Sequence, residues 1–249
     1  MRPPATDSPL KAVLWDMDGT IVDTEPYWIE AEHALVAAHG GSWSHEQAMQ
    51  LVGQSLTFSA GILQQAGVQL TVRQIIDTLT AEVIRNVQRR VPWRPGAREL
   101  LEDVHRAGVR SALVTMSEGP LAREIVASLP RPYFEFLVTG DTVTRGKPHP
   151  EAYLTAVELL RQADPGLTID HCVALEDSAP GVAAAVASGV ATVAIPHIVP
   201  LPEDPRHITW DSLEGRTVSE LESITAHRQA GNSGAATVPI SASRSLAVD

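Results

Sequence analysis

Five short apolar runs along the chain have the pattern of buried β-strands. They lie at residues 11–16, 109–115, 136–140, 171–176 and 190–195. Each run is nearly continuous in apolar residues instead of alternating, which is typical of strands covered on both faces in a parallel sheet. Because helical patterns separate most of these runs, we predict a doubly wound α/β domain built on a parallel sheet.

Three of the separating helices have recognisable ends. Residues 97–107 show helical periodicity and stop at Gly108, a residue suited to the position after a helix C-terminus. Pro150 precedes the pattern at residues 151–162, and proline favours the first turn of a helix. Residues 179–188 are rich in alanine and close at a glycine. These signals support the alternation of strand and helix.

Residues 24–91 break that alternation. They contain no convincing strand, but they do contain four helical stretches, at residues 26–40, 45–52, 55–66 and 71–90. We therefore predict a separate helical cap at 24–91, inserted into a core formed by residues 10–23 and 92–225. The insertion follows the first strand, where open α/β sheets bind their ligands, so the cap is expected to act as a lid over the site.

The two ends of the chain differ from the rest in composition. Residues 1–9 are polar and rich in proline, and residues 226–249 are mostly small and polar with no aromatic side chain. Such segments bury too little apolar surface to offset the entropy of ordering. Both are predicted to be unstructured tails.

Composition and charge limit the class of protein. Of the 249 residues, 44% are apolar and 20% are charged, which is typical of a soluble globular protein. A formal charge of −11 argues against a nucleic-acid partner, which requires a basic face. No run of apolar residues is long enough for a membrane span. We expect no nucleic acid and no membrane among its partners.

Cysteine usage suggests the compartment. Cys172 is the only cysteine, so the chain forms no internal disulfide and no cysteine-based zinc site. It lies in an apolar run and is expected to be a small buried hydrophobe. The first residues lack the apolar core of a signal peptide. The expected location is the cytoplasm, and the expected state is a monomer or weak dimer.

Acidic residues are concentrated directly after the first strand. Asp16, Asp18, Asp23 and Glu25 lie within ten residues of one another. Carboxylates at the end of a buried strand lose hydration and repel one another. A positive partner is therefore expected among them, with Asp23 placed where the chain leaves for the cap.

Polar residues also follow the other strands. Thr115 ends the second strand, Lys147 lies in a proline-rich loop after the third, and the fourth ends in an acidic pair. Because the carboxyl ends of parallel strands share one edge of the sheet, we expect these side chains to converge there. The converging set is Asp16, Asp18, Thr115, Lys147, Glu176 and Asp177.

The charges of this set indicate a metal and an anion. Four carboxylates with one lysine would be unstable together without a divalent cation, and oxygen ligands without cysteine favour Mg²⁺ over zinc. Lys147 and Thr115 can then donate to phosphate oxygens. Of two carboxylates at i and i+2, Asp16 and Asp18, one can attack or bind metal while the other moves a proton. Taken singly, each residue also has an ordinary structural role, such as helix capping or surface solvation.

Four motifs, taken in order, resemble the signature of the haloacid dehalogenase superfamily. They are 16-DMDGT-20, Thr115 in 113-LVTMS-117, Lys147 in GKP, and Glu176 with Asp177 in ALEDS. The helical insert between the first two motifs resembles the branch of sugar-phosphate phosphatases and β-phosphoglucomutases. The resemblance covers roughly residues 10–225 and implies an enzyme acting on a small phosphorylated metabolite.

The resemblance also implies roles for the motif residues. Asp16 attacks phosphorus and forms an aspartyl-phosphate, while Asp18 protonates the leaving oxygen and then takes a proton from water. Thr115 and Lys147 hold the phosphoryl group. The implied Mg²⁺ ligands are the Asp16 side chain, the Asp18 backbone carbonyl, Asp177, and Glu176 directly or through water.

Three further residues are candidates for binding substrate. Met116 lies beside Thr115 at the end of the second strand. Thr24 and Glu25 either only begin the first cap helix or also face the substrate, and both interpretations remain open here.

Two departures from the mutases favour simple hydrolysis. Trp28 stands where the resemblance places a histidine, and the position of a cap-loop arginine falls near Leu56. We therefore predict a Mg²⁺-dependent phosphatase of a small phosphomonoester, most simply a sugar phosphate. The alternatives are a phosphosugar mutase and, of another class, a non-catalytic phosphate-binding or regulatory module.

Overall fold

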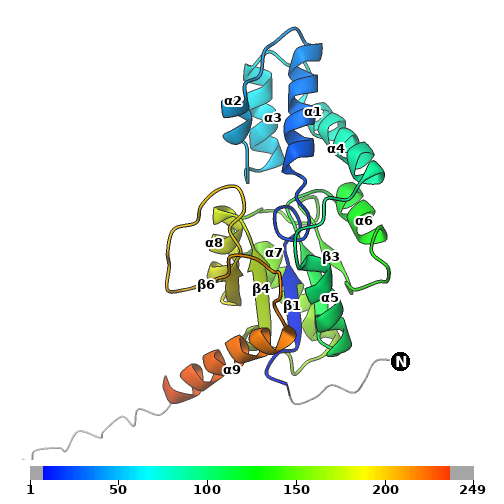
Figure 1. The fold of residues 1–249 in the computed structure, drawn as a ribbon. Coiled ribbons are helices and arrows are strands. Elements are labelled where there is room, and N and C mark those ends of the chain that lie inside the picture. The colour runs from blue at the N-terminus through cyan, green and yellow to red at the C-terminus, as the bar shows by residue number, and fades with distance from the viewer. Residues whose placement is uncertain (1–7, 236–249) are drawn as a thin grey trace, which may run out of the picture.

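The computed structural model describes residues 8–235 of the chain. A sheet with helices on both faces forms one part, and four helices, α1–α4, form a second group beyond one end of the strands (Figure 1). The chain forms the first strand of the sheet, then crosses into the helical group, and afterwards returns to form the rest of the sheet. This arrangement places the helical group over the end of the sheet where polar residues were expected to converge.

The sheet has six parallel strands in the order β3-β2-β1-β4-β5-β6. The predicted α/β class and parallel sheet are confirmed, with each of the five predicted strands present in shortened form. The sixth strand, β6, has two residues and was not predicted from the sequence. The strands are β1 (Ala12–Trp15), β2 (Arg110–Val114), β3 (Leu137–Val138), β4 (Cys172–Glu176), β5 (Ala191–Ala194) and β6 (Ile208–Thr209).

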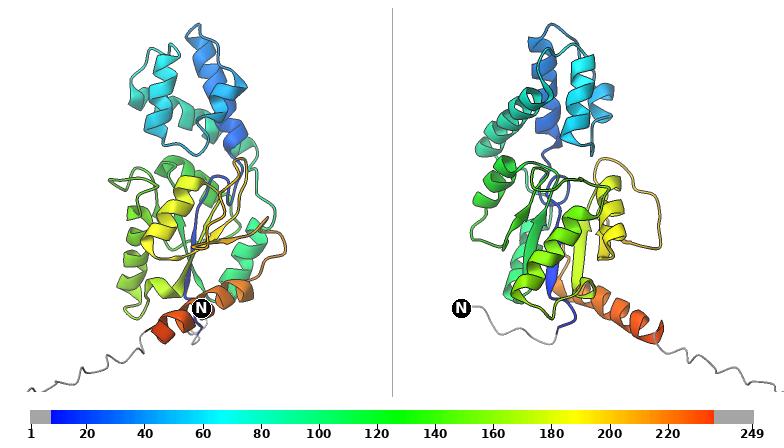
Figure 2. Two further views of the ribbon diagram at one scale, coloured as in Figure 1. Left: turned by 90° about the vertical axis from the view of Figure 1, so that its left-hand side faces the viewer. Right: turned by 180° about the vertical axis from the view of Figure 1, so that it is seen from behind.

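Each face of the sheet supports its own apolar cluster. Successive strand residues point to opposite faces, so Val13 and Trp15 pack in one cluster while Ala12 and Leu14 pack in the other. All four side chains are fully buried. Figure 2 shows the helices that cover the two faces. They are α5 (Ala97–Arg106), α6 (Gly119–Ala127) and α9 (Val218–Ala235) on the first face, and α7 (Glu151–Ala163) and α8 (Ala179–Ser188) on the second.

Helix α9 corrects the predicted C-terminal tail. It continues to Ala235, so residues 226–235 are helical, and the tail predicted to begin at 226 is wrong for these positions. The Arg228 side chain donates to Asp170 at 3.1 Å, and Gln229 donates to the Pro9 carbonyl at 3.1 Å. These long-range contacts stabilise a segment whose composition alone would not order. Residues 1–7 and 236–249 of the predicted tails lie outside the described residues.

Within residues 8–235, no helix is both long and apolar enough to cross a membrane. The two longest helices, α4 (Val72–Arg89) and α9, both contain charged residues.

The four-helix group at the far end is organised by local capping. The side chains of Ser44, Ser55 and Thr71 each accept a hydrogen bond from a backbone N–H of the helix that follows. Ser44 and Thr71 belong to full capping boxes, in which a glutamine reaches back to the cap. The helices are α1 (Glu25–Ala38), α2 (His45–Met49), α3 (Leu56–Gln65) and α4 (Val72–Arg89). We refer to this group, residues 25–89, as the cap.

The backbone passes between the core and the cap at two places, which we call the crossings, and an ion pair adds a further contact. At the crossings, the Asp23 N–H donates to the Pro92 carbonyl at 2.8 Å, and the Arg94 N–H donates to the Ile21 carbonyl at 2.9 Å. Beyond them, the Arg73 guanidinium on α4 donates to both carboxylate oxygens of Glu118, at 2.6 and 2.8 Å. Glu118 immediately precedes α6, so this pair fixes α4 beside the core.

Candidate active site

The expected convergence occurs at the carboxyl ends of β1, β2 and β4. Trp15 lies level with Leu113 on one side and with Leu175 on the other. Asp16 comes directly after Trp15, and Thr115 lies two residues beyond Leu113, so both emerge at the same edge as Glu176. Lys147 reaches this edge from the loop between β3 and α7.

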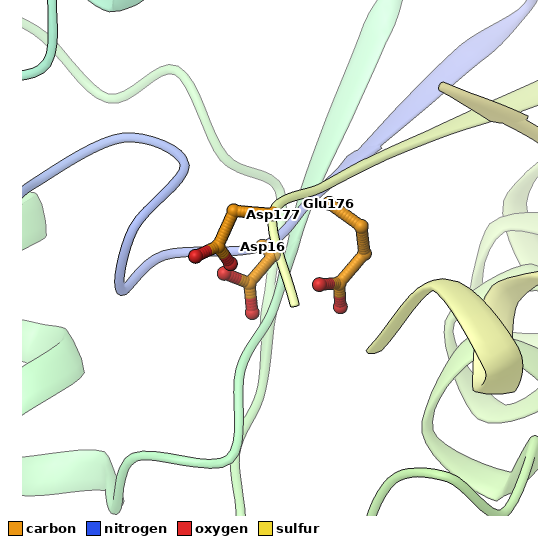
Figure 3. A group of neighbouring side chains, drawn as sticks. All are labelled: Asp16, Glu176 and Asp177. Carbon is orange, nitrogen blue, oxygen red and sulfur yellow. The ribbon is translucent and has the colours of Figure 1, made fainter. Parts of the chain in front are cut away.

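Three carboxyl groups form the centre of the site. Oxygen atoms of Asp16, Glu176 and Asp177 lie within 4.8 Å of one another. Figure 3 shows these three side chains at the ends of their strands. Burial, followed by the charge of Glu176, raises the pKa of Asp16 to about 8. Burial and the charge of Asp16 also raise the pKa of Asp177 well above its ordinary value. Negative charge on these three groups is therefore unfavourable without a cation beside them.

Lys147 supplies the positive charge at the centre. Its ammonium donates to Asp16 Oδ1 at 2.7 Å, to the Val114 carbonyl at 2.9 Å, and to Glu176 Oε1. Burial acts to lower the pKa of Lys147, but Asp16 and Glu176 outweigh it and raise that pKa above its ordinary value. Only 4% of the lysine side chain is exposed, so it is a fixed buried cation.

Glu176 is occupied by the protein's own donors. Besides Lys147, it accepts a hydrogen bond from the Tyr153 hydroxyl at 2.6 Å and one from Ser178 Oγ at 3.3 Å. A side chain at Gly181 would collide with its carboxylate. Glu176 is fully buried, and its contacts show that it positions Lys147. Sequence reasoning did not identify Tyr153, whose role depends on a contact across 23 positions of the chain.

The loop after β1 packs directly against Asp177. Gly19 has a φ of +88°, and a Cβ there would overlap the Asp177 carboxylate. Asp177 Oδ1 is buried and has no hydrogen-bond partner. A buried carboxylate oxygen without a donor is costly, so a bound group at this position would stabilise it.

Asp18 is held by hydroxyl groups from both the core and the cap entrance. Its Oδ1 accepts from Thr24 at 2.5 Å, and its Oδ2 accepts from Thr115 at 3.2 Å and from Ser117 at 2.7 Å. Thr24 and Thr115 were candidates from the sequence, while Ser117 was not. Its place two residues after Thr115 at the same strand end is the signal that could have identified it.

A cavity of about 300 Å³ lies between this site and the cap. Eight of the site residues predicted from the sequence line it, whereas the fully buried Glu176 does not. Met116 also binds the loop that carries the lysine, because its sulfur accepts the Lys147 backbone N–H at 3.2 Å. The predicted residues that line the cavity are Asp16, Asp18, Thr24, Glu25, Thr115, Met116, Lys147 and Asp177.

The cap end of the cavity has a different character. Trp28, Leu51, Leu56 and Leu79 give it apolar walls, and Glu32 adds a second carboxyl group beside that of Glu25. Sequence reasoning missed Glu32. Positions 25, 28 and 32 follow the three- and four-residue spacing of one helix face, which is the signal that could have found it.

His197 connects the two cap crossings at the rim of the cavity. Its Nε2 lies 3.0 Å from Asp23 Oδ1, and its Nδ1 lies 2.7 Å from Arg94 Nη1. Arg94 is a donor only, so Nδ1 accepts from it. Nε2 forms no hydrogen bond to the Asp23 carboxylate despite the short distance. Asp23 therefore lies at the exit to the cap, where the sequence placed it, but its histidine partner was not predicted.

Comparisons with known proteins agree with this geometry. The chain is 31% identical over 186 residues to the phosphorylated carbohydrates phosphatase of Thermotoga maritima, covering 73% of this chain and 82% of that protein. It is 33% identical over 192 residues to hexitol phosphatase A of Escherichia coli, covering 74% and 82%. The crystal structure of CbbY from Rhodobacter sphaeroides in complex with phosphate shares the fold, with a TM-score of 0.74, 24% identity, and coverage of 83% of this chain and 96% of that one.

The family match spans the site. Residues 13–195 match the haloacid dehalogenase-like hydrolases, a segment that runs from β1 through the cap to the end of β5. It includes all the residues at the centre of the site. On this match and the sequence identities above, the chain belongs to the haloacid dehalogenase-like hydrolase family.

Proposed function

We propose that this hydrolase is a Mg²⁺-dependent phosphatase that acts on a small phosphomonoester, a sugar phosphate, through an aspartyl-phosphate intermediate. The observation that carries the proposal is the position of Asp16 at the floor of the cavity, bonded to Lys147 and beside Asp177. The names of the two relatives, a phosphorylated carbohydrates phosphatase and a hexitol phosphatase, support the same substrate class.

The site fits a magnesium ion. Its potential ligands are all oxygen atoms, it has more carboxylates than cations, and Asp177 Oδ1 has no donor within the protein. Asp16, Asp177 and the backbone carbonyl of Asp18 would hold the ion, with Glu176 more remote because Lys147 and Tyr153 already bond to it. When bound, the ion would offset the charge of the carboxylates and of the substrate's phosphate oxygens.

Asp16 is the proposed nucleophile. One of its carboxylate oxygens attacks phosphorus, a new O–P bond forms, and the bond from phosphorus to the substrate oxygen breaks. Lys147 fixes the carboxylate through Asp16 Oδ1 and brings a positive charge close to the transferring group. The low exposure of both side chains limits competition from bulk water.

Asp18 is the proposed general acid and base. It gives a proton to the departing substrate oxygen, and it later takes a proton from the water that attacks the phosphorylated Asp16. Phosphate then leaves, and the Asp16 carboxylate is restored. The hydroxyls of Thr24, Thr115 and Ser117 orient Asp18 at the edge of the cavity.

The cavity walls favour hydrolysis over the mutase alternative. Trp28 and Leu56 both line the cavity. The family resemblance places a mutase histidine at Trp28 and a mutase arginine near Leu56, and both positions present apolar surface here. Nothing at those positions would grip a second phosphate and return it to the enzyme. Water is therefore the expected acceptor of the phosphoryl group.

A single assay separates the candidate functions. The purified protein is mixed with p-nitrophenyl phosphate and a panel of sugar phosphates, with Mg²⁺ or with EDTA, and both free phosphate and isomeric sugar phosphates are measured. A Mg²⁺-dependent release of phosphate equal to the substrate consumed supports the proposal. An isomeric phosphate without free phosphate would identify a mutase, and saturable binding without turnover would identify a non-catalytic module.

A further inference from the structure

The cap end of the cavity contains two carboxyl groups that the proposed reaction does not use. Glu25 and Glu32 both belong to α1 and both line the cavity, on the helix face that carries Trp28. Only 4% of Glu32 is exposed. Buried acids are rare in protein interiors unless a partner or a function retains them.

Within residues 8–235, no cation on the cavity lining accompanies these acids at the cap end. Lys147 and His197 are the only basic side chains among the described residues that line the cavity. Lys147 is bonded at the floor to Asp16 and Glu176. His197 accepts a hydrogen bond from Arg94, and its Nε2 lies 3.0 Å from Asp23 Oδ1 without a hydrogen bond between them. The cap end therefore has no positive charge of its own to offer a ligand.

The hydrogen bonding of Glu32 leaves capacity for a ligand. Its Oε2 accepts from the Trp43 indole N–H at 3.2 Å, a neutral donor. Burial raises the pKa of Glu32 to about 7, with the Trp43 hydrogen bond acting in the opposite direction. Burial, followed by the charges of Glu32 and Asp18, raises the pKa of Glu25 to about 8. Hydroxyl donors from a ligand would replace the hydrogen bonds to water that these two carboxyl groups lose on burial.

The apolar walls of the cap end indicate which kind of ligand fits there. Trp28 and Leu79 add carbon surface to the lining of the cavity, and Ser59 adds one hydroxyl. A carbon chain bearing hydroxyls has both surfaces that this lining requires, C–H groups for the walls and O–H groups for the acids. A cavity of about 300 Å³ accommodates such a chain together with one phosphate.

We propose that Glu32 and Glu25 are specificity-determining residues that bind hydroxyl groups of the substrate, so that the preferred substrate carries one phosphate on a neutral, polyhydroxylated chain. This inference rests on the proposed phosphatase function. Glu32 receives one hydroxyl from the substrate while retaining Trp43, and Glu25 receives another nearer the core. The phosphate lies at the opposite end, with Lys147.

The same residues exclude a second anion. A phosphate or carboxylate at the far end of the substrate would lie among apolar walls and two carboxyl groups, with no cation to offset its lost hydration. Sugar bisphosphates and phosphorylated carboxylic acids are therefore expected to be poor substrates. A monophosphate of a sugar or sugar alcohol incurs no such cost.

The test compares substrates that differ in hydroxyl content. In Glu32→Gln, kcat/KM for sorbitol 6-phosphate is expected to fall about 10- to 100-fold, the range for one hydrogen bond to a charged group. With p-nitrophenyl phosphate, which has no hydroxyl to bind, kcat/KM should change by less than about 3-fold. The matched control is Glu30→Gln, because Glu30 lies on the exposed side of the same helix. Its kinetics should match the wild type on both substrates.

Each outcome has a separate meaning. Equal losses on both substrates in Glu32→Gln, or no loss on sorbitol 6-phosphate, would overturn the specificity assignment and leave the phosphatase proposal intact. Turnover of fructose 1,6-bisphosphate by the wild type as efficiently as fructose 6-phosphate would also overturn it. Absence of wild-type activity on p-nitrophenyl phosphate would instead remove the proposed function on which the inference rests.

Discussion

The two ends of the cavity use the same chemical group in different electrostatic settings. At the core end, the buried carboxyl groups of Asp16 and Asp177 adjoin Lys147, and an oxygen of Asp177 remains without a donor. At the cap end, the carboxyl groups of Glu25 and Glu32 have no cation beside them and are faced by apolar walls. Burial raises the pKa in both places, but only the core end contains a positive charge.

This difference explains a division of tasks. Carboxylates with a fixed cation, and with room for a metal, can remain charged and act on a phosphoryl group. Carboxyl groups without one can serve as hydrogen-bond partners for neutral hydroxyls. The supporting structures differ as well, because strands of the sheet position the core end, whereas a single helix joined through two crossings positions the cap end.

Replacing the nucleophile should give the largest effect. In Asp16→Asn, kcat is expected to fall about 10³-fold or more, because an amide oxygen does not attack phosphorus as a carboxylate does. Phosphate release from p-nitrophenyl phosphate measures this loss. Asp77→Asn is the control, since Asp77 is exposed on α4 and pairs with the surface side chain of Arg73 at 2.7 Å. Full activity in Asp16→Asn would refute the assignment.

Removing the buried cation should affect stability as well as activity. Lys147→Met leaves Asp16 and Glu176 without their partner, and we expect the free energy of unfolding to drop by about 3 kcal/mol, within the range for breaking buried ion pairs. Denaturation by urea without Mg²⁺ measures this change. Lys11→Met serves as the matched control. Its ammonium lies 3.2 Å from Asp164 with both side chains partly exposed, so a loss below about 1 kcal/mol is expected. Equal losses in the two variants would show that Lys147 has no special role.

Replacing Glu32 at the cap end should change the free energy of unfolding in the opposite direction, as a gain in stability. The pKa of Glu32 is about 7 in the folded protein against an ordinary value of 4.5, so the folded state holds a proton that the unfolded state has already released. Its contribution to stability is therefore complete below pH 4.5 and decreases as the pH rises through 7. Glu32→Gln removes this decrease. We expect the free energy of unfolding of the variant, relative to that of the wild type, to be about 2 kcal/mol higher at pH 8 than at pH 4.5.

Urea denaturation at pH 4.5 and pH 8 measures that difference, with Glu30→Gln as the exposed control. A difference between Glu32→Gln and the wild type that stays constant with pH would contradict the buried charge at the cap end. A gain in stability together with the loss of specificity described above would show that Glu32 is kept for binding at a cost to folding.

The smallest effect should come from the hydroxyl behind the core site. Tyr153→Phe removes the donor that lies 2.6 Å from Glu176, and we expect a loss of about 1 to 2 kcal/mol in unfolding free energy. Activity should fall only a few-fold, because Lys147 remains bonded to Glu176. Tyr27→Phe is the control, since its hydroxyl donates to the Arg90 carbonyl at 3.0 Å in an exposed position. An effect of Tyr153→Phe no larger than that of Tyr27→Phe would remove Tyr153 from the supporting network.

The core end could be predicted from the sequence because its geometry follows from topology. Parallel strands end at one edge, so an acid, a threonine or an acidic pair placed directly after a strand must lie there. Lys147 required only the expectation that the loop after the third strand returns to the same edge. Asp16, Asp18 and Asp177 accordingly line one cavity.

The remaining features depend on contacts that periodicity does not encode. Glu32 reaches the cavity because α1 crosses it at one particular rotation, and Tyr153 reaches Glu176 through side-chain packing across the sheet face. The end of α9 has a composition typical of a tail, but Arg228 and Gln229 contact segments far away in sequence. β6 is too short to show a pattern at all.

The most direct test of the central claim is to look for a phosphoryl group on Asp16. Asp18→Asn and the wild type are mixed with Mg²⁺ and p-nitrophenyl phosphate, quenched in acid within one turnover, and digested for peptide mass analysis. Nitrophenolate leaves without a proton, so Asp18→Asn should still form the phosphorylated Asp16. Its hydrolysis should be slow, because no base takes the proton of the attacking water. The account predicts a phosphorylated peptide at Asp16, more abundant in the variant. Phosphate release with no phosphoryl group on Asp16 in either protein, or one attached to another residue, would contradict it.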